Sequence, residues 1–442
     1  MTKPPVLVVW EHGGNLGHLS QLLPVMRALR KQGHAVVFAV AQPHQVAPWL
    51  AGTDITLLQA PQVDVALHYA TSAVCPADIW LRCGFASPPH AAVCVRQWLA
   101  LFDGLMPAAV LVDASPLALY AAQMAGLPGV ALGNGFALPP ALPGLSFAPW
   151  QGDLAPSIVH SERVLASALA GLAAGMARDC PSVRALSSGV CRANSIGAML
   201  SLSAQALCTW PELDHFDRAA DAAGYVGPIW TDLPGGQAVA WPDKPGAKVI
   251  CYLTLNDTRH DFMWQALQQH GANVVVVSPT GVEGVCELAR GWGITVCRHA
   301  VAMTGLLQDC DAVIGHGGGG LTSMALLGGK PLMVLPTQLE QGLMAYRLTQ
   351  RGLAISSLSP LNKTQVQARV AQLLQDAALQ ARVTALAQRY AGYLPQQAVD
   401  RVVAMLLNGA GQNTDPNASL NNPANTAVSA PNEPERVTCS LL

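Results

Sequence analysis

The chain of 442 residues is 51% hydrophobic and only 12% charged, and its formal net charge is −2. This charge argues against the basic surface by which proteins bind nucleic acids. The length exceeds what one hydrophobic core supports, so we expect two domains. No apolar run is long enough to span a bilayer, and the N-terminus lacks a signal-peptide pattern. We therefore expect a cytoplasmic protein, whose apolar content leaves room for peripheral contact with a membrane.

Short β-branched runs alternate with helical stretches along the chain. Between the first two runs, residues 19–33 carry apolar side chains at helical spacing and end on Gly33, a residue that suits a helix C-terminus. Continuous apolar strands joined by helices predict parallel sheets covered on both faces. Because the pattern occurs twice, we expect an α/β protein with two Rossmann-like, doubly wound domains facing each other across a cleft. The runs cover residues 6–10, 35–40, 109–114 and 129–134, then 248–255, 273–279, 294–299, 312–317 and 331–336.

Composition marks the boundaries between these parts. Pro and Gly are dense over residues 224–248, which predicts a joint between the domains. A helical pattern returns at 394–408, and the chain then becomes rich in Asn, Pro, Ser and Ala, which predicts disorder. We expect an N-terminal domain at 1–226, a linker at 227–246, a C-terminal domain at 247–390, a final helix within 391–408 and a disordered tail at 409–442.

The loop after the first strand, EHGGNLGH (residues 11–18), leads into the first helix. Its glycines allow a ligand to approach closely, and the helix that follows offers free N–H groups. His18 opens this helix, and a histidine can take up a proton near neutral pH. The alternative is that His18 only caps the helix or packs in a polar crevice.

Asp113 ends the run AVLVDA, so its carboxylate belongs at the same edge of the same sheet. A carboxylate on the far ring nitrogen of His18 would fix the tautomer and stabilise the imidazolium. Asp113 is also well placed to cap the helix after Ser115-Pro116, and residue types alone do not decide between the two roles.

The second loop is GHGGGGLTS, residues 315–323, between an apolar strand and a helix expected at 321–327. A strand, a glycine run and a helix N-terminus in this order form a cradle for anions such as phosphate. The spacing does not fit a Walker loop, because Lys330 lies too far along. Gly315, Gly317 and Gly320 match the dinucleotide fingerprint literally, but no acidic residue follows at the required distance.

Glu340 and Gln341 follow the strand end in LMVLPTQLEQ, in the same predicted cleft. An acid beside an amide can hold several hydroxyls through hydrogen bonds. The alternative is an ordinary solvated loop pair.

The eleven cysteines are scattered without a Cys-x-x-Cys pair. Metal sites and disulfide frameworks need clustered spacing, so we expect reduced thiols buried as small hydrophobes, and no metal site.

Three segments together resemble the GT-B glycosyltransferases, specifically the nucleotide-sugar-dependent family 1 (UDP-glycosyltransferase-like) that includes plant and bacterial natural-product glucosyltransferases. They are GHLSQLLPVMRALRKQGHAVVF (17–38), VLVDASPLALYAAQMAGLPGVAL (110–132) and DAVIGHGGGGLTSMALLGGKPLMVLPTQLEQGLMAYRLTQRGLA (311–354). The resemblance implies an acceptor-binding N-terminal domain, a donor-binding C-terminal domain and a final helix that crosses back to the first domain. It also implies inverting transfer without a metal, with the nucleotide sugar as co-substrate and no other cofactor.

The resemblance also implies roles for individual residues. His18 matches the base that deprotonates an acceptor hydroxyl, and Asp113 matches its paired aspartate. Glu340 and Gln341 match the pair that grips the donor sugar. The diphosphate-binding segment corresponds to His316, Gly317, Gly318, Gly319, Gly320 and Thr322.

Four positions depart from the family pattern. The usual Ser or Thr five residues after the loop histidine is Leu321, with Thr322 one place later, and the ribose-binding Glu is replaced by Met324. The Trp that stacks on the base falls at Arg298, whose guanidinium plane can also stack. The usual Gly-Ser turn is replaced by Leu255-Asn256-Asp257. UDP is the family default, and dTDP stays open because enzymes that use it often lack the ribose-binding Glu.

The sequence therefore predicts a hexosyltransferase acting on a small acceptor, whose pocket we expect residues 136–215 to shape. The Pro, Phe and Trp content of FALPPALPGLSFAPW and CTWPELDHF suits a flat hydrophobic molecule. Three alternatives stay open: a catalytically degenerate relative that binds or activates a partner, a nucleotide-sugar epimerase, and a lipid-linked sugar transferase of the cell-wall type.

Overall fold

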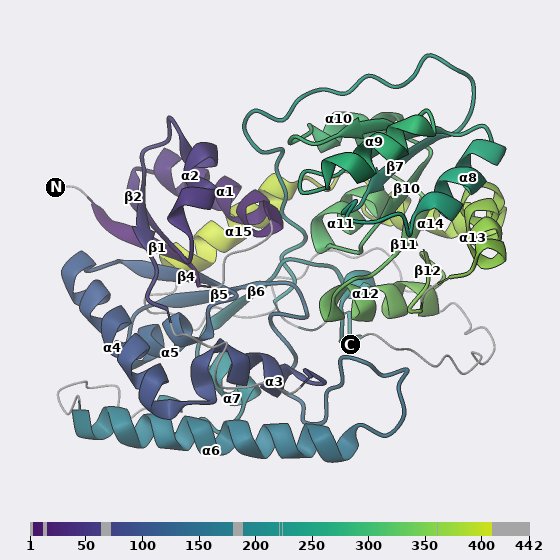
Figure 1. Ribbon diagram of the computed structural model, residues 1–442. Helices are drawn as coiled ribbons and strands as arrows, with labels where there is room; N and C mark the ends of the chain where they lie inside the picture. The colour runs from purple at the N-terminus through teal and green to yellow at the C-terminus, as the bar shows by residue number, and fades with distance from the viewer. Residues whose placement is uncertain are drawn as a thin grey trace.

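The computed structural model describes residues 3–11, 16–62, 72–179, 189–220, 222, 224–359 and 361–408. The predicted tail at 409–442 and residues 12–15 of the first loop lie outside this range. Two six-stranded parallel sheets lie side by side in Figure 1, each with helices on both of its faces. The predicted fold class is confirmed.

The first sheet has the strand order β3-β2-β1-β4-β5-β6. Its central strands are fully buried apolar runs, as a sheet covered on both faces requires. The strands are β1 (Lys3–Trp10), β2 (His34–Val40), β3 (Ile55–Gln59), β4 (Ala109–Asp113), β5 (Gly129–Gly133) and β6 (Ala204–Leu207).

Alternate side chains of β1 point to opposite faces of this sheet and into two separate cores. Val6 and Val8 pack with the first two helices and with the last helix, α15 (Pro395–Asn408), whereas Leu7 and Val9 pack with the five helices from Pro76 to Leu200. The helices that follow the first strands are α1 (Leu16–Lys31), α2 (Pro43–Leu50), α3 (Pro76–Trp80) with the π-helical turn η1 (Leu81–Phe85), α4 (Pro88–Leu105), α5 (Pro116–Met124), α6 (Ala155–Asp179) and α7 (Ile196–Leu200), with short 3-10 turns η3 (Gly189–Arg192) and η4 (Pro211–Leu213).

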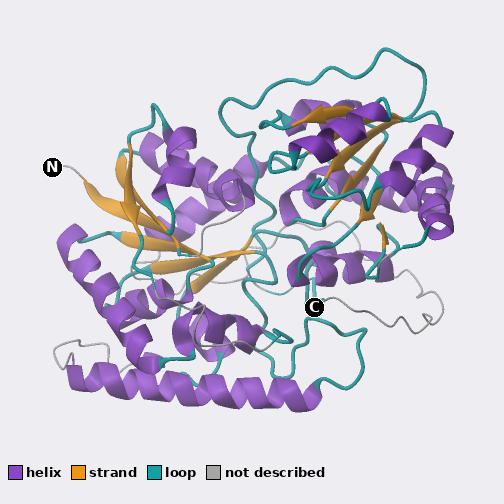
Figure 2. Cartoon of the chain, in the orientation of Figure 1, coloured by secondary structure: helices purple, strands orange, loops and turns teal. Residues whose placement is uncertain are grey.

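The second sheet has the order β12-β11-β10-β7-β8-β9, and one core cluster surrounds it. Figure 2 shows its strands enclosed by helices. The strands are β7 (Lys248–Tyr252), β8 (Asn273–Val277), β9 (Thr295–Cys297), β10 (Ala312–Gly315), β11 (Leu332–Val334) and β12 (Ile355–Ser356). The helices are α8 (Asp261–Gln269), α9 (Glu283–Gly291), α10 (Met303–Asp309), α11 (Gly319–Leu327), α12 (Leu339–Gln350), α13 (Lys363–Gln375) and α14 (Ala377–Arg389).

The two halves exchange elements. The last helix, α15 (Pro395–Asn408), packs against α1 and buries Val399, Val402 and Leu406 in the core of the first sheet (Figure 1). In the opposite direction, Trp210 and Leu213 follow the first sheet in sequence but belong to the core of the second. The side chains of each half therefore complete the core of the other.

Each of the nine predicted strands overlaps an observed one, while β3, β6 and β12 were not predicted. The second loop ends earlier than expected, because α11 begins at Gly319 and not at Leu321. Two of the four glycines thus form the first turn of the helix, where their N–H groups have no intrahelical acceptor.

No helix within the described residues has the length and apolarity needed to cross a bilayer.

Candidate active site

A cavity of about 950 Å³ lies between the two halves. It is bounded by the loops that leave the carboxyl ends of strands in both sheets, the edge at which open α/β sheets bind ligands. Of the residues expected to bind a donor or an acceptor, it is lined by His18, Asp113, Arg298, His316, Gly318, Gly319, Gly320, Glu340 and Gln341.

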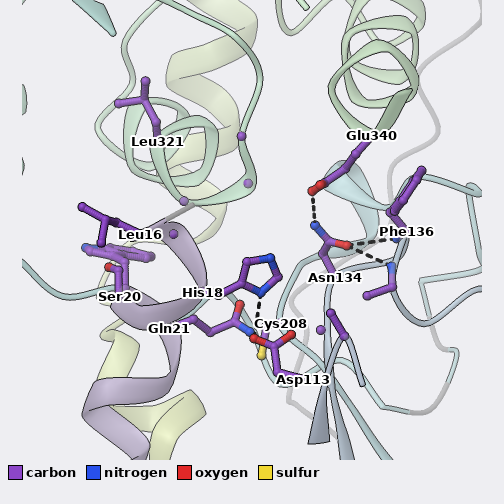
Figure 3. A pocket seen from close by; sticks show the side chains of 18 of the residues that line it. Leu16, His18, Ser20, Gln21, Asp113, Asn134, Phe136, Cys208, Leu321 and Glu340 are labelled. Atoms are coloured by element: carbon purple, nitrogen blue, oxygen red, sulfur yellow. Dashed lines mark hydrogen bonds and ion pairs between the residues drawn. The ribbon is translucent and has the colours of Figure 1, made fainter. Parts of the chain in front are cut away.

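His18 and Asp113 form the floor of this cavity (Figure 3). β1 pairs with β4 so that Trp10 lies opposite Asp113, and the first turn of α1 carries His18 over the end of this strand pair. His18 Nδ1 lies 2.8 Å from Asp113 Oδ2, and the ring stacks on Trp10 at 5.1 Å between centroids. The carboxylate fixes Nδ1 as the protonated nitrogen in the neutral ring, which leaves Nε2 as the acceptor facing the open space.

The environment of His18 favours its charged form. Burial lowers the pKa of the imidazole, but the charge of Asp113 and its hydrogen bond, together with the charge of Glu340, raise the pKa to about 9. Asp113 is 1% exposed, whereas 37% of the His18 side chain is exposed, so solvent moderates the attraction between them. The net effect favours an imidazole of His18 that carries a proton on both nitrogens, and is therefore charged, at neutral pH.

A buried network beneath the pair fixes the turn after β4. Ala114 has a left-handed φ of 44°, which is uncommon for a non-glycine residue. The Ser115 hydroxyl donates to the Asp113 carbonyl at 2.7 Å and accepts from the Glu11 N–H at 2.6 Å. The Glu11 carboxylate accepts from the Ala118 N–H at 2.8 Å, so Glu11, and not Asp113, caps the start of α5. Burial raises the pKa of Glu11 to about 8. This role of Glu11 could not be predicted from the sequence, because 107 residues separate the two partners.

The four glycines have different surroundings. Gly317 has a left-handed φ of 94°, and a Cβ there would lie 2.7 Å from Val334 Cγ1, so this glycine is required by the turn. A Cβ on Gly318 or Gly320 would meet nothing within 4 Å, because their backbones border the cavity. Thr322, the last residue of the predicted diphosphate-binding segment, is 1% exposed and is not among the residues that line the cavity.

His316 lines the cavity, but both of its ring nitrogens bind backbone groups. Nε2 accepts from the Thr254 N–H at 3.0 Å, and Nδ1 donates to the Leu335 carbonyl at 2.9 Å. Burial lowers its pKa, so the ring is neutral. The ring therefore joins the loops after β7 and β11, the two strands flanking β10.

Glu340 and Gln341 lie in the first turn of α12. Gln341 lines the cavity, and its Oε1 accepts from the Thr337 N–H at 2.9 Å. Glu340 Oε1 accepts from Asn134 Nδ2 at 2.6 Å across the cleft (Figure 3). Asn134 was not predicted as a site residue, although Asn134 follows a buried strand just as Asp113 ends one.

Arg298 follows β9 and forms an ion pair with Glu283 of α9. This pair holds the guanidinium at the cavity wall, in a position that leaves stacking on a base open.

The first-half side of the cavity is apolar. Residues of the expected segment 136–215 line it, but α2, α3 and α5 contribute as well, which the sequence did not suggest. Part of that segment, 180–188, lies outside the described residues. The large apolar side chains on this side include Trp49, Ile79, Trp80, Leu119, Phe136, Leu138, Phe147 and Leu200.

Comparison with known proteins identifies the architecture. Residues 274–405 match the family described as "Erythromycin biosynthesis protein CIII-like, C-terminal domain". The chain is similar to the structure of the glycotransferase of kitacinnamycin, with 19% identity over 91% of this chain and 100% of that one and a TM-score of 0.66. No curated protein sequence matches the chain.

Two further structures have the same fold. The glycosyltransferase VinC in complex with dTDP is 18% identical over 91% of this chain and 100% of that one, with a TM-score of 0.59. The spinosyn rhamnosyltransferase SpnG, complexed with thymidine diphosphate, is 18% identical over 90% of this chain and 99% of that one, with a TM-score of 0.56. The fold is that of the GT-B glycosyltransferases. Within it, residues 274–405 form an EryCIII-like C-terminal domain.

Proposed function

We propose that the protein is an inverting glycosyltransferase, which moves a hexose from a nucleoside diphosphate sugar to a hydroxyl of a small hydrophobic acceptor. One observation carries this proposal: the His18–Asp113 pair and the open backbone of Gly318 to Gly320 line the same cavity from opposite halves. A general base and an anion cradle facing one space are what direct displacement at an anomeric carbon needs.

In the proposed reaction, the acceptor oxygen attacks the anomeric carbon from the face opposite the diphosphate. His18 Nε2 takes the hydroxyl proton as the new C–O bond forms, and Asp113 stabilises the resulting imidazolium. The bond from the anomeric carbon to the phosphate oxygen breaks, and its electron pair leaves with the nucleoside diphosphate. The configuration at the anomeric carbon is inverted.

The leaving diphosphate gathers negative charge, and the start of α11 suits it. The N–H groups of Gly319, Gly320 and Leu321 have no intrahelical acceptor, and the helix dipole adds partial positive charge there. Loss of one preorganised donor of this kind typically costs about 3–4 kcal/mol of transition-state stabilisation. His316 supports these groups by holding the neighbouring loops.

The sequence favours UDP as the family default and leaves dTDP possible, but we favour dTDP. Met324 contributes an apolar thioether to the cavity where the family resemblance implies a ribose-binding Glu. A deoxyribose has one hydroxyl fewer to bind, so it tolerates this exchange better than ribose does. The dTDP and thymidine diphosphate complexes of VinC and SpnG support the same choice.

Mass spectrometry and anomeric NMR of products from a screen of dTDP- and UDP-hexoses against aromatic and polyketide-like acceptors test this proposal. We expect a glycoside of inverted configuration with a dTDP-sugar, and loss of turnover in His18→Ala. Full turnover in His18→Ala would remove the base. Binding without any turnover would favour the degenerate relative, and a new sugar nucleotide formed without acceptor would favour an epimerase.

A further inference from the structure

Asn134 lies in the loop after β5, and the backbone of the following residues in that loop fixes the orientation of its side-chain amide. Oδ1 accepts from the N–H groups of Phe136 and Ala137 at 3.0 and 3.2 Å. An amide oxygen held by two N–H donors turns the NH2 group to the other side. In Asn134 that side is the cleft (Figure 3).

A buried ion pair holds this loop in place. Arg218 donates to the carbonyls of Gly135 and Leu138, and its Nε lies 3.5 Å from Asp214 Oδ2. The Asp214 side chain has no exposed surface, and that of Arg218 is 10% exposed. The position of Asn134 is thus set by the fold on the first-half side of the cleft.

The NH2 group of Asn134 contacts Glu340 in the other half and lies near the start of α11. Nδ2 donates to Glu340 Oε1 at 2.6 Å, and a Cβ added to Gly319 would lie 3.7 Å from Nδ2. It therefore stands between the carboxylate proposed to grip the sugar and the helix start proposed to hold the diphosphate. Glu340 also contributes to the raised pKa of His18, which sets its charge close to the proposed base.

One N–H of Asn134 and one oxygen of Glu340 stay available. Among the described residues, the second Nδ2 proton has no acceptor and Glu340 Oε2 has no donor. A sugar hydroxyl both donates and accepts, so it can satisfy the two groups at once.

We infer that Asn134 recognises the donor sugar from the acceptor side of the cleft. It orients Glu340, and its remaining N–H donates to one sugar hydroxyl, which in turn donates to Glu340 Oε2. This inference rests on the proposed function. It extends sugar recognition beyond Glu340 and Gln341 to a residue of the first half.

Calorimetric binding of two probes, dTDP-glucose and dTDP alone, to the full chain tests this role. In Asn134→Ala we expect the affinity for dTDP-glucose to fall about tenfold while that for dTDP stays within about twofold, because one hydrogen bond to the sugar is lost and Glu340 loses the group that orients it. Asn134→Asp should lose more, because a second carboxylate then faces Glu340. An unchanged affinity for dTDP-glucose, or an equal loss for both probes, would overturn the inference.

Two control variants separate recognition from a looser joint between the halves. Tyr390→Phe removes a hydrogen bond from Tyr390 to Glu212, which also joins the halves but lies outside the cavity. Asn194→Ala changes an exposed Asn away from the cavity. Both variants should bind both probes as the wild type does. If Tyr390→Phe instead loses as much affinity for dTDP-glucose as Asn134→Ala does, Asn134 only holds the two halves together.

Binding of the probes by the wild type distinguishes failure of this inference from failure of the proposed function. If the unaltered chain binds neither these two probes nor UDP-glucose and UDP, the proposed donor chemistry fails. If it binds them and Asn134→Ala binds equally well, only the role of Asn134 fails.

Discussion

At the residue scale, the proton on His18 decides when the proposed base can act. A base must be neutral before it takes a proton, and Asp113 holds the pKa of His18 well above its ordinary value of about 6.5. The rate with limiting acceptor should therefore increase with pH toward about 9.

Asp113→Asn changes this pH dependence in a defined direction. Without the carboxylate, burial lowers the pKa of His18, so the rise in kcat/KM should move down by roughly two pH units. The plateau rate should fall about 100-fold, because the imidazolium loses its partner. Full pH profiles of both proteins measure the shift. Asp54→Asn, which changes an exposed carboxylate paired with Arg30, is the control and should leave the profile in place. An unmoved midpoint in Asp113→Asn would mean that another group titrates.

The same pair should make folding stability depend on pH. Because the folded pKa of His18 is raised, the stabilisation by Asp113 is complete below about pH 6.5 and is lost as the pH rises through about 9. The free energy of unfolding in urea should therefore differ more between wild type and Asp113→Asn at pH 6 than at pH 9.5. A difference that grows with pH would contradict the assignment of the charged form.

At the element scale, a substitution at the start of α11 should weaken ligand binding without weakening the fold. Gly320→Ala adds a methyl group that meets no protein atom but enters the cavity. The variant should be as stable as the wild type or up to about 1 kcal/mol more stable, because alanine favours a helix. Nucleoside diphosphate binding should weaken by about 1–3 kcal/mol through steric conflict. Thermal melts and calorimetry measure the two effects.

Two other glycines serve as controls for this helix start. Gly305→Ala lies in α10, outside the cavity and equally uncrowded, so it should leave binding unchanged. Gly317→Ala should unfold more easily, because its left-handed φ and Val334 oppose a side chain. Equal binding by Gly320→Ala and Gly305→Ala would count against the anion cradle.

The elements also explain what the sequence could and could not predict. Continuous β-branched runs predicted the central strands, and the residues at the strand ends indicated Asp113 and the glycine loop as candidate site residues. The strand β12 has only two residues, too few for any periodicity. The partners of His316 are backbone groups of Thr254 and Leu335, and backbone groups leave no trace in residue identity. Asn134 acquires its partner only when the two halves meet.

At the scale of the whole molecule, the exchange of elements couples the halves on either side of the cavity. α15 completes the core of the first sheet, and the segment around Trp210 completes that of the second. Glu212 in this segment accepts hydrogen bonds from Arg389 and Tyr390, and Arg351 forms an ion pair with Asp217. A ligand bound between the halves thus meets walls whose positions depend on both cores.

Trp210→Ala tests whether this coupling makes the halves unfold together. Trp210 is 6% exposed, and its ring stacks on Tyr390 at 4.0 Å between centroids. Its loss should cost about 3–5 kcal/mol and should separate the unfolding of the two halves, because it removes a shared part of the core. Scanning calorimetry measures this as a calorimetric enthalpy that exceeds the van't Hoff enthalpy. Trp264→Ala, buried wholly within the second core, should cost a similar amount yet keep the single transition that we expect of the wild type. One sharp transition in both variants would mean that α15, and not the Trp210 segment, unites the molecule.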